Sequence, residues 1–260
     1  RDFKQSILNP YGMILVTGPT GSGKTTTLYS ALNELSRPDV NIITVEDPVE
    51  YQLPGINQVH VRPEIGLTFA NTLRAILRQD PNIIMVGEIR DQETADISVR
   101  AALTGHLVLS TLHTNDAPGA IGRLIDMGVE PFLISSSVIM VCAQRLVRRI
   151  CQSCKEEVVI PEPVLKVAQV RFDDGKPHPF YRGKGCRVCN GTGYSGRVSL
   201  IEVLTINDSL RELVARRATA TEIKERACSL GMQTLRKVGL MAVKAGVTTL
   251  EEVLRETSRD

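Results

Sequence analysis

Residues Met13 to Thr26 read MILVTGPTGSGKTT, an apolar run that leads into a glycine-rich loop. The loop matches the pattern G-x-x-x-x-G-K-[ST] of a P-loop, and helix-compatible sequence follows it. Glycines let the backbone N–H groups turn toward phosphate oxygens, and the helix N-terminus adds a favourable potential for anions. A strand–helix turn with a chance lysine is the alternative, but strand, loop and helix in this order favour nucleoside triphosphate binding.

The pattern assigns roles to single residues. Lys24 is expected to reach the β- and γ-phosphates, and the Thr25 hydroxyl to ligate Mg²⁺. The residues expected to hold ATP are Gly18, Pro19, Thr20, Gly21, Ser22, Gly23, Lys24, Thr25 and Thr26.

Short apolar runs alternate with helical patterns from residue 12 to about residue 145. Strands that are apolar on both faces and separated by helices are typical of a parallel sheet with both faces covered. The sequence therefore predicts an α/β fold with right-handed crossovers. Residues 48–68 break the pattern and are expected to form a small surface hairpin. The expected strands are 13–17, 41–46, 83–86 and 107–111, and the expected helices are 24–36, 69–78, 92–103 and 117–127.

The composition changes after Arg149, where paired cysteines, prolines and glycines precede further helical sequence. Asp208, Thr219 and Thr248 are candidate N-caps of three helices. We expect a P-loop core over 1–149, a cysteine-containing insertion over 150–198 and a helical subdomain over 199–260. Strand-like sequence begins abruptly at residue 12, which suggests a fragment of a longer protein.

Composition excludes several classes of protein. The 260 residues are 42% hydrophobic and 23% charged, enough for a sizeable core and unlike a disordered chain. A net charge of +2, with five Phe, five Tyr and no Trp, gives no support for a nucleic-acid surface. The longest apolar run, 138–143, is far below the ~20 residues that span a bilayer. No apolar signal segment follows Arg1, so a cytosolic protein is expected.

A second acidic position ends the apolar run 83–86. Gly87 stands where a P-loop enzyme usually has an Asp that holds Mg²⁺, and Glu88 follows it. Glu88 is the candidate to orient or deprotonate the attacking water. A carboxylate that only caps the next helix is the alternative, but Asp91 and Glu93 already suit that role.

Two further strand ends carry polar residues. Glu46, Asp47 and Glu50 crowd three carboxylates directly after a strand, where they repel each other unless a cation or arginines lie nearby. Glu46 is therefore expected to help Thr25 hold Mg²⁺, with a solvated acidic turn as the alternative. His113 follows another strand and is a candidate γ-phosphate sensor, although a lone His is more often structural.

Arginines and cysteines complete the candidates. Arg74 and Arg78, four residues apart on one helical face, call for phosphate or acidic neighbours unless the face is simply solvated. Two C-x2-C pairs supply four thiolates, enough for closed tetrahedral Zn²⁺ coordination at the base of an extended loop. Disulfides are the alternative and are disfavoured in a reducing cytosol. Cys142 lies apart, in sequence that is expected to be helical. The four expected Zn²⁺ ligands are Cys151, Cys154, Cys186 and Cys189.

Together these motifs resemble the C-terminal motor domain of the secretion ATPase superfamily, which drives type II secretion and type IV pilus assembly. The resemblance covers about residues 8–204. It rests on the P-loop, the acidic box 44–50, the strand ending in GEIRD at 87–91 and the histidine box 104–114, in the order that the family shows.

The resemblance implies a RecA-like core, ATP and Mg²⁺ as ligands and cytoplasmic hexamers that move an inner-membrane platform protein, with the membrane reached through partners. It implies that Glu50 and Glu88 activate the attacking water and help to bind the metal, and that His113 lies near the γ-phosphate. It also implies that a glycine in place of the usual Asp, as at Gly87, is common in this family. The cysteine insertion occurs in assembly and secretion ATPases and is generally missing from pilus retraction ATPases, which argues against a retraction motor. The arginines implied at the nucleotide site or at subunit contacts are Arg74, Arg78, Arg90 and Arg123.

Other functions remain open at this point. A nucleic-acid translocase or helicase shares the RecA-like core, although charge and aromatic content speak against it. A small-molecule kinase would need an acceptor pocket and a lid that the sequence does not show. Pilus assembly and type II secretion are not separated by the motifs.

Overall fold

The computed structural model describes residues 2–167, 170 and 178–258. The chain divides into two compact units, which we call unit 1 (Arg1–Ala143 with Val203–Met232) and unit 2 (Gln144–Glu202 with Gln233–Asp260). Two long strands, β6 (Val138–Ile150) and β9 (Tyr194–Thr205), each run from one unit into the other.

The helices after residue 207 do not stay together as the single subdomain that we expected. Helix α8 packs against α6 and helix α9 against α5, so both belong to unit 1, while α10 and α11 pack on each other in unit 2. Their bounds are α8 (Asp208–Ala215), α9 (Ala220–Ser229), α10 (Leu235–Lys244) and α11 (Leu250–Glu256). Thr219 caps α9 in a capping box, as predicted, while the caps of α8 and α11 are Asn207 and Thr249, each one residue from the predicted position.

A seven-stranded sheet in the order β3-β2-β4-β5-β1-β6-β9 carries the predicted strands. Every registered pair among β1 to β6 is parallel, which confirms the α/β prediction. All residues of β1, β2, β4 and β5 are buried, as apolar runs without alternation predict. The first five strands are β1 (Gly12–Thr17), β2 (Ile42–Glu46), β3 (Asn57–His60), β4 (Ile83–Val86) and β5 (Leu107–Leu112).

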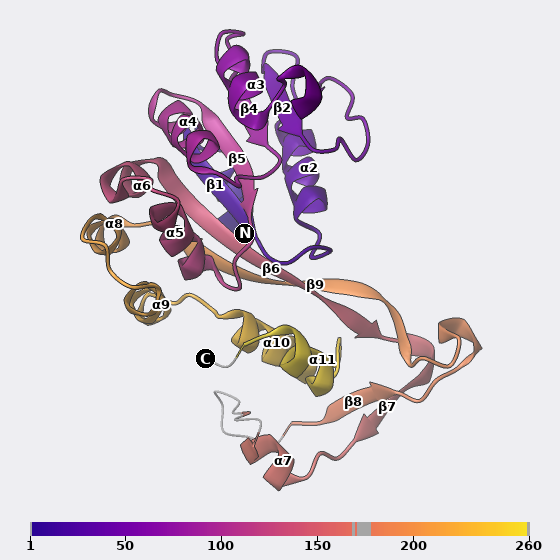
Figure 1. Cartoon of the computed structure of the whole chain (residues 1–260). Helices are drawn as coiled ribbons and strands as arrows, with labels where there is room; N and C mark the ends of the chain where they lie inside the picture. The colour runs from indigo at the N-terminus through magenta and orange to yellow at the C-terminus, as the bar shows by residue number, and fades with distance from the viewer. Residues whose placement is uncertain (1, 168–169, 171–177, 259–260) are drawn as a thin grey trace. The chain divides into compact units, whose positions relative to one another are not determined.

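Helices cover both faces of this sheet (Figure 1). The step from β1 to β2 runs toward the β3 edge, whereas the steps from β4 to β5 and from β5 to β6 run the other way. Right-handed crossovers therefore place α2 on one face and α4 and α5 on the other. The helices before β6 are α1 (Asp2–Ser6), α2 (Lys24–Leu35), α3 (Phe69–Ile76), α4 (Gln92–Leu103), α5 (Ala117–Asp126) and α6 (Pro131–Ser137), with a 3-10 turn η1 (Pro63–Ile65). Within the described residues, no helix is long and apolar enough to cross a bilayer.

The predicted surface hairpin over 48–68 is wrong. Residues 57–60 form β3, which pairs in parallel with β2 from Ile43 opposite Asn57 to Glu46 opposite His60. The sequence NQVH has a single apolar residue, because an edge strand buries little of its surface. The antiparallel element here is one isolated bridge between Arg62 and Leu67.

Unit 2 contains a small antiparallel sheet of β7 (Lys155–Val158) and β8 (Phe180–Gly183), with helix α7 (Glu162–Val167) and the 3-10 turns η2 (Gln152–Cys154) and η3 (Arg187–Cys189). The helical environment predicted for Cys142 is wrong, because this residue is buried in β6. An apolar run of six residues has no period that separates a buried strand from a buried helix.

A buried ion pair stabilises unit 2. The Glu252 side chain is fully buried, and Arg148 donates to it from the backbone N–H at 3.0 Å and from Nη2 at 2.7 Å. Arg255 donates to the same carboxylate at 3.0 Å, and Arg148 also lies 4.0 Å from the centre of the Tyr194 ring. Burial alone would raise the pKa of Glu252, but the hydrogen bonds from Arg148 lower it below its ordinary value.

We predict that Glu252→Gln destabilises the protein by about 1–3 kcal/mol at pH 7, less than for a fully enclosed pair because Arg148 is partly exposed. A lowered carboxyl pKa gives stability that is present above the unfolded value of ~4.3 and is lost as the pH falls through the folded value. The difference from wild type should therefore shrink below about pH 4. The free energy of unfolding of both proteins is measured by urea unfolding, followed by circular dichroism, at pH 7 and in acid. Glu156→Gln, which breaks the exposed pair with Arg182, is the control and should cost under ~1 kcal/mol.

Candidate functional site

The carboxyl ends of parallel strands meet at one edge of a sheet, which is where α/β proteins bind ligands. In unit 1 the P-loop follows β1, Glu46 ends β2, Glu88 comes shortly after β4, and His113 follows β5. The parallel register thus brings the separately predicted motifs to one edge.

The P-loop has the backbone that its glycines predict. Gly18, Gly21 and Gly23 have φ angles of 149°, 78° and 86°, a region that favours glycine. Gly23 is the N-cap of α2 and has no side chain with which to cap the first amides of that helix. Lys24 Nζ donates to the carbonyl oxygens of Gly18 at 2.9 Å and Pro19 at 3.1 Å, so the cation lies over the loop. The loop can therefore offer backbone donors and one positive charge to a polyphosphate.

Glu88 lies between two of the other predicted site residues. Its Oε1 pairs with Arg90, and its Oε2 lies 3.5 Å from His113 Nε2. The hydrogen bond to Glu88 is the main reason why the pKa of Arg90 is raised. Only 14% of the Glu88 side chain is exposed, against 50% of His113. A largely enclosed carboxylate that keeps some exposure and has a basic group on each side is suited to orient a water molecule.

Strand β5 holds the backbone around Glu88 in place. Thr111 Oγ1 donates to the Gly87 carbonyl at 2.7 Å, and the Ile89 N–H donates to the Thr111 carbonyl at 3.1 Å. Thr17, at the end of β1, bonds the Thr114 hydroxyl at 2.8 Å and accepts from the Thr114 N–H at 2.7 Å. Sequence reasoning missed these threonines, because a Thr inside an apolar run signals only a strand.

Gly87 is a glycine for a steric reason. Its N–H donates to the Val45 carbonyl at 2.8 Å, so this residue lies directly against the end of β2. A Cβ atom there would approach the Val45 carbonyl and the Glu46 Cα to 3.3 Å each. The carboxylate that other P-loop enzymes carry at this position would fit only if the backbone of β2 gave way by a few tenths of an ångström.

Glu46, predicted to ligate Mg²⁺, lies in a buried polar network. Its side chain accepts hydrogen bonds from Tyr29, from Thr44 Oγ1 at 2.5 Å and from Gln58 Nε2 at 3.1 Å. Burial, followed by the bond to Glu46, raises the pKa of Tyr29 well above its ordinary value. Glu50 is exposed, and its backbone N–H lies 3.4 Å from the Tyr29 hydroxyl. The sequence shows Tyr29 only as one more residue on the buried face of α2.

The four predicted arginines do not share one acidic partner. Arg90 pairs with Glu88, whereas Arg74 pairs with Glu93 at 2.6 Å. Arg78 and Arg123 are exposed, and neither forms an ion pair within the part of the chain that the structure describes.

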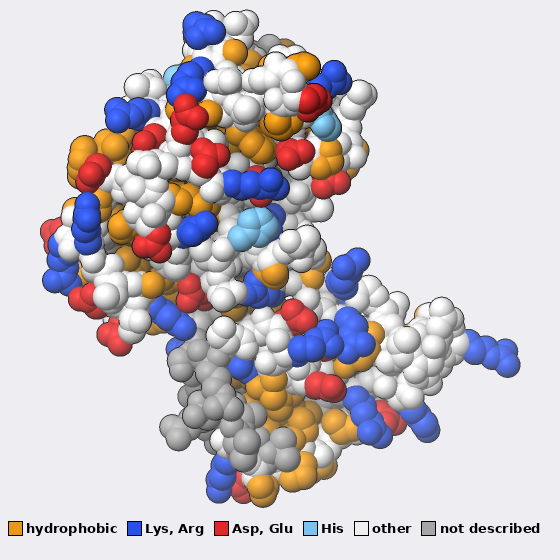
Figure 2. Space-filling view, viewed as in Figure 1, with side chains coloured by type: hydrophobic (Ala, Val, Ile, Leu, Met, Phe, Trp, Pro, Cys, Tyr) orange, Lys and Arg blue, Asp and Glu red, His pale blue; other side chains and the backbone are white. Residues whose placement is uncertain are grey.

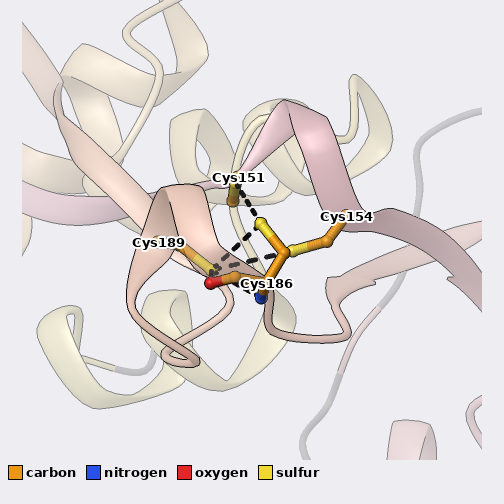
Figure 3. A group of neighbouring side chains, drawn as sticks. All are labelled: Cys151, Cys154, Cys186 and Cys189. Carbon is orange, nitrogen blue, oxygen red and sulfur yellow. Dashed lines mark hydrogen bonds between the residues drawn. The ribbon is translucent and has the colours of Figure 1, made fainter.

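The two predicted cysteine pairs do come together, in unit 2 (Figure 3). The sulfur atoms of Cys151 and Cys186 lie 3.9 Å apart, those of Cys154 and Cys189 3.8 Å, and those of Cys186 and Cys189 3.7 Å. All four lie within 4.8 Å of one another and none forms a disulfide. Four sulfurs at ~2.3 Å from a central Zn²⁺ would lie about 3.8 Å apart, so the cluster fits tetrahedral coordination.

Backbone donors surround these sulfurs. The N–H groups of Cys186 and Gly193 approach Cys189 Sγ at 3.2 and 3.3 Å, and that of Gly185 approaches Cys154 Sγ at 3.3 Å. Burial opposes ionisation of Cys189, but these donors lower its pKa to about 6. Metal-bound cysteines are thiolates, and such donors stabilise their charge.

Glycines let the backbone before and after the second cysteine pair come into contact. A Cβ on Gly183 would lie 1.9 Å from the Gly193 carbonyl oxygen, and one on Gly193 (φ 77°) would lie 2.4 Å from the Gly183 carbonyl oxygen. No side chain fits between these backbones.

Residues 1–255 match the family described as Type II/IV secretion system protein. The chain belongs to this family. It is 56% identical over 259 residues to the type IV pilus assembly ATPase PilB of Myxococcus xanthus, covering 99% of this chain and 46% of that protein. It is 52% identical to the type II secretion system ATPase E of Vibrio cholerae, covering 98% of this chain and 50% of that protein.

Among solved structures, the pilus retraction motor PilT with bound ADP resembles the chain with a TM-score of 0.75 and 30% identity, over 99% of this chain and 64% of that one. The chain spans about half the length of the PilB and ATPase E relatives. This secretion-family member therefore has an α/β fold similar to that of an ADP-binding motor.

We predict that Gly87→Ala destabilises this secretion-family chain by about 1–3 kcal/mol, because the new methyl group must push β2 aside. Gly122→Ala is the matched control: it lies in α5 with nothing within 4 Å of a new Cβ, and should stabilise the chain by up to ~1 kcal/mol. Thermal unfolding of both variants decides; equal behaviour would contradict the steric explanation of Gly87.

Proposed function

We propose that this chain is the ATP-hydrolysing motor segment of a ring-shaped ATPase that powers type IV pilus assembly or type II protein secretion. The observation that carries the proposal is the shared sheet edge where the P-loop, the Glu88–His113 pair and the acidic turn come together. The relatives named as ATPases, at 56% and 52% identity over nearly the whole chain, support it.

The P-loop amides and Lys24 bind the triphosphate, and Lys24 exchanges its two carbonyl partners for phosphate oxygens. The Thr25 hydroxyl is the expected protein ligand of Mg²⁺, which neutralises phosphate charge when bound. His113 faces Glu88 and acts as the γ-phosphate sensor, because it can contact the γ-phosphate and Glu88 at the same time. Glu88, oriented by Arg90, positions the attacking water and accepts its proton, with Glu50 from the acidic turn assisting.

Arg78 and Arg123 are available for a neighbouring subunit, because they are exposed and have no ion pair in the described chain. In phosphoryl transfer an arginine supplied in trans is worth ~10³-fold or more. We therefore propose a homohexamer at the cytoplasmic face of the inner membrane, with hydrolysis moving a platform protein that anchors the ring there.

The family resemblance links a cysteine insertion to assembly and secretion ATPases, so the cluster supports one of these functions over pilus retraction. PilB and ATPase E are named for assembly and secretion, whereas the retraction motor PilT is a more distant match at 30% identity. A nucleic-acid translocase gains no support: on the face of the described residues seen in Figure 2, acidic and basic side chains are intermingled over the helices of unit 1.

We propose that Cys151, Cys154, Cys186 and Cys189 hold a structural Zn²⁺. All four coordination positions are protein sulfurs, so no position is open for substrate. A metal here substitutes for an apolar core, which the glycine-rich loop lacks.

For ATP hydrolysis we predict a separation of binding from turnover. Lys24→Ala should weaken ATP binding about tenfold or more, because the cation over the loop is lost. Glu88→Gln should leave binding within about twofold and lower kcat by ~10² or more, because an amide accepts no proton. Fluorescent-nucleotide titration and steady-state ATPase assays measure both effects. The control Glu34→Gln removes an exposed carboxylate that pairs with Lys4 and should change neither. Near-normal turnover in Glu88→Gln would refute its catalytic assignment.

For the metal we predict one Zn²⁺ per chain by elemental analysis of protein purified without chelator. Gly193→Ala should reduce retained Zn²⁺ severalfold on dialysis against chelator, because the new Cβ meets the Gly183 carbonyl. Gly196→Ala is the control: it has the same φ of 77° but nothing within 4 Å, so it carries the backbone strain without the clash and should keep the metal. Equal metal loss in both variants would contradict the close-approach argument.

A further inference from the structure

We propose that Tyr29 and Glu46 position the acidic turn 47–51 against the P-loop helix, and that Glu46 anchors this turn instead of ligating Mg²⁺. The inference rests on the proposed ATP hydrolysis for its effect on rate, and on the geometry of unit 1 for its structural part.

The Glu46 carboxylate is already occupied by the protein. Its Oε2 accepts from the Tyr29 hydroxyl, and its Oε1 accepts from Thr44 at 2.5 Å and from Gln58 at 3.1 Å. The residue is 2% exposed. Mg²⁺ demands near-octahedral geometry and usually keeps several waters. Three of the roughly four acceptor sites of this carboxylate are taken by protein donors, and its burial leaves no space for a hydrated cation.

The Tyr29 hydroxyl connects three elements. Tyr29 is fully buried on α2 and donates to Glu46 at the end of β2. The same hydroxyl accepts from Gln58 Nε2 on β3 at 3.2 Å and from the Glu50 backbone N–H at 3.4 Å. One oxygen atom thus links the P-loop helix, the acidic strand end and the turn after it.

Gln58 and Tyr51 hold the rest of the turn. Gln58 Oε1 accepts from the Leu53 N–H at 2.7 Å, and its Nε2 donates to the Tyr51 carbonyl at 3.2 Å. The Tyr51 ring meets the Tyr29 ring edge-on, with centres 4.7 Å apart. Residues 50–53 are therefore bonded to α2 and β3 through their backbone, while the Glu50 side chain stays exposed.

The position of this junction explains why it should affect rate. Tyr29 lies five residues after Lys24 on the same helix, roughly 7.5 Å along its axis. The junction therefore sets where Glu50 lies relative to the residues that bind phosphate. A displacement of about 1 Å at such a group can cost ~10²-fold in rate while binding persists. Tyr29 and Glu46 are thus positioning residues that act through Glu50.

The test uses Tyr29→Phe, which removes only the hydroxyl, and Glu46→Gln, which keeps the shape. Gln58→Met on the half-buried edge strand is a third variant, which removes the bonds to residues 51 and 53 together with those to Tyr29 and Glu46, with little risk to folding. Tyr11→Phe, at an exposed tyrosine of unit 1, is the control. The measurements are kcat and KM for ATP, the Mg²⁺ concentration at half-maximal nucleotide binding, and amide hydrogen exchange at residues 50 and 53.

We expect Tyr29→Phe and Glu46→Gln each to lower kcat about tenfold, with KM and the Mg²⁺ midpoint within about twofold of wild type. The double variant should be little worse than either single variant, because both act through one junction. Exchange at residues 50 and 53 should accelerate in all three variants, whereas the amides of β1 stay protected.

Three results would overturn the proposal. One is a tenfold rise of the Mg²⁺ midpoint in Glu46→Gln alone, which would make Glu46 a metal ligand. Another is unchanged exchange at residues 50 and 53. The third is accelerated exchange throughout β1 and α2, which would make the network a general support of the fold. If the wild-type chain binds Mg²⁺–nucleotide without hydrolysing ATP, the proposed function is wrong, and the exchange and Mg²⁺ measurements still decide this inference.

Discussion

The parallel register of β1, β2, β4 and β5 is the constraint on which the candidate nucleotide site depends. Parallel pairing directs every carboxyl end to the same edge, so loops separated by many residues deliver their side chains to one place. Hydrogen bonds between the strand ends then determine the details. Thr17 bonds Thr114, and Thr111 bonds the carbonyl of Gly87. These bonds hold Glu88 and His113 at the ends of two adjacent strands.

Two glutamates at the candidate nucleotide site of unit 1 have different environments. Glu46 is enclosed by Tyr29, Thr44 and Gln58, whereas Glu88 keeps part of its surface open and faces a histidine. Burial with full hydrogen bonding makes a carboxylate a structural acceptor, while partial exposure leaves it free to take a proton. The environments therefore suit Glu46 to a structural role and leave Glu88 as the candidate to take a proton.

Unit 2 depends on other interactions. Its small sheet has four-residue strands and exposes much of its surface, so it buries little apolar area. The sulfur cluster and the close approach of Gly183 to Gly193 hold the cysteine-containing segment, and the partly exposed Arg148 connects β6 to the buried Glu252 of α11. The cysteine pairs lie 35 residues apart in the chain and Arg148 lies 104 residues from Glu252, so these contacts give a defined structure to a segment with a small core.

The sequence by itself determined the α/β class, the P-loop and the pairing of four cysteines, because each has a local pattern with a physical cause: continuous apolar strands, a glycine-rich turn before a helix, and C-x2-C spacing. It also predicted Glu88 and His113 as separate candidates. Only the tertiary structure decided that they face each other, that residues 57–60 add a parallel edge strand, and that Cys142 lies in a strand. It likewise decided that Glu46 is enclosed by Tyr29 and Gln58, and that a Cβ on Gly87 would lie tightly against the end of β2. These features depend on contacts between residues distant in the chain, and neither period nor composition records which side chains a fold brings within 4 Å of each other.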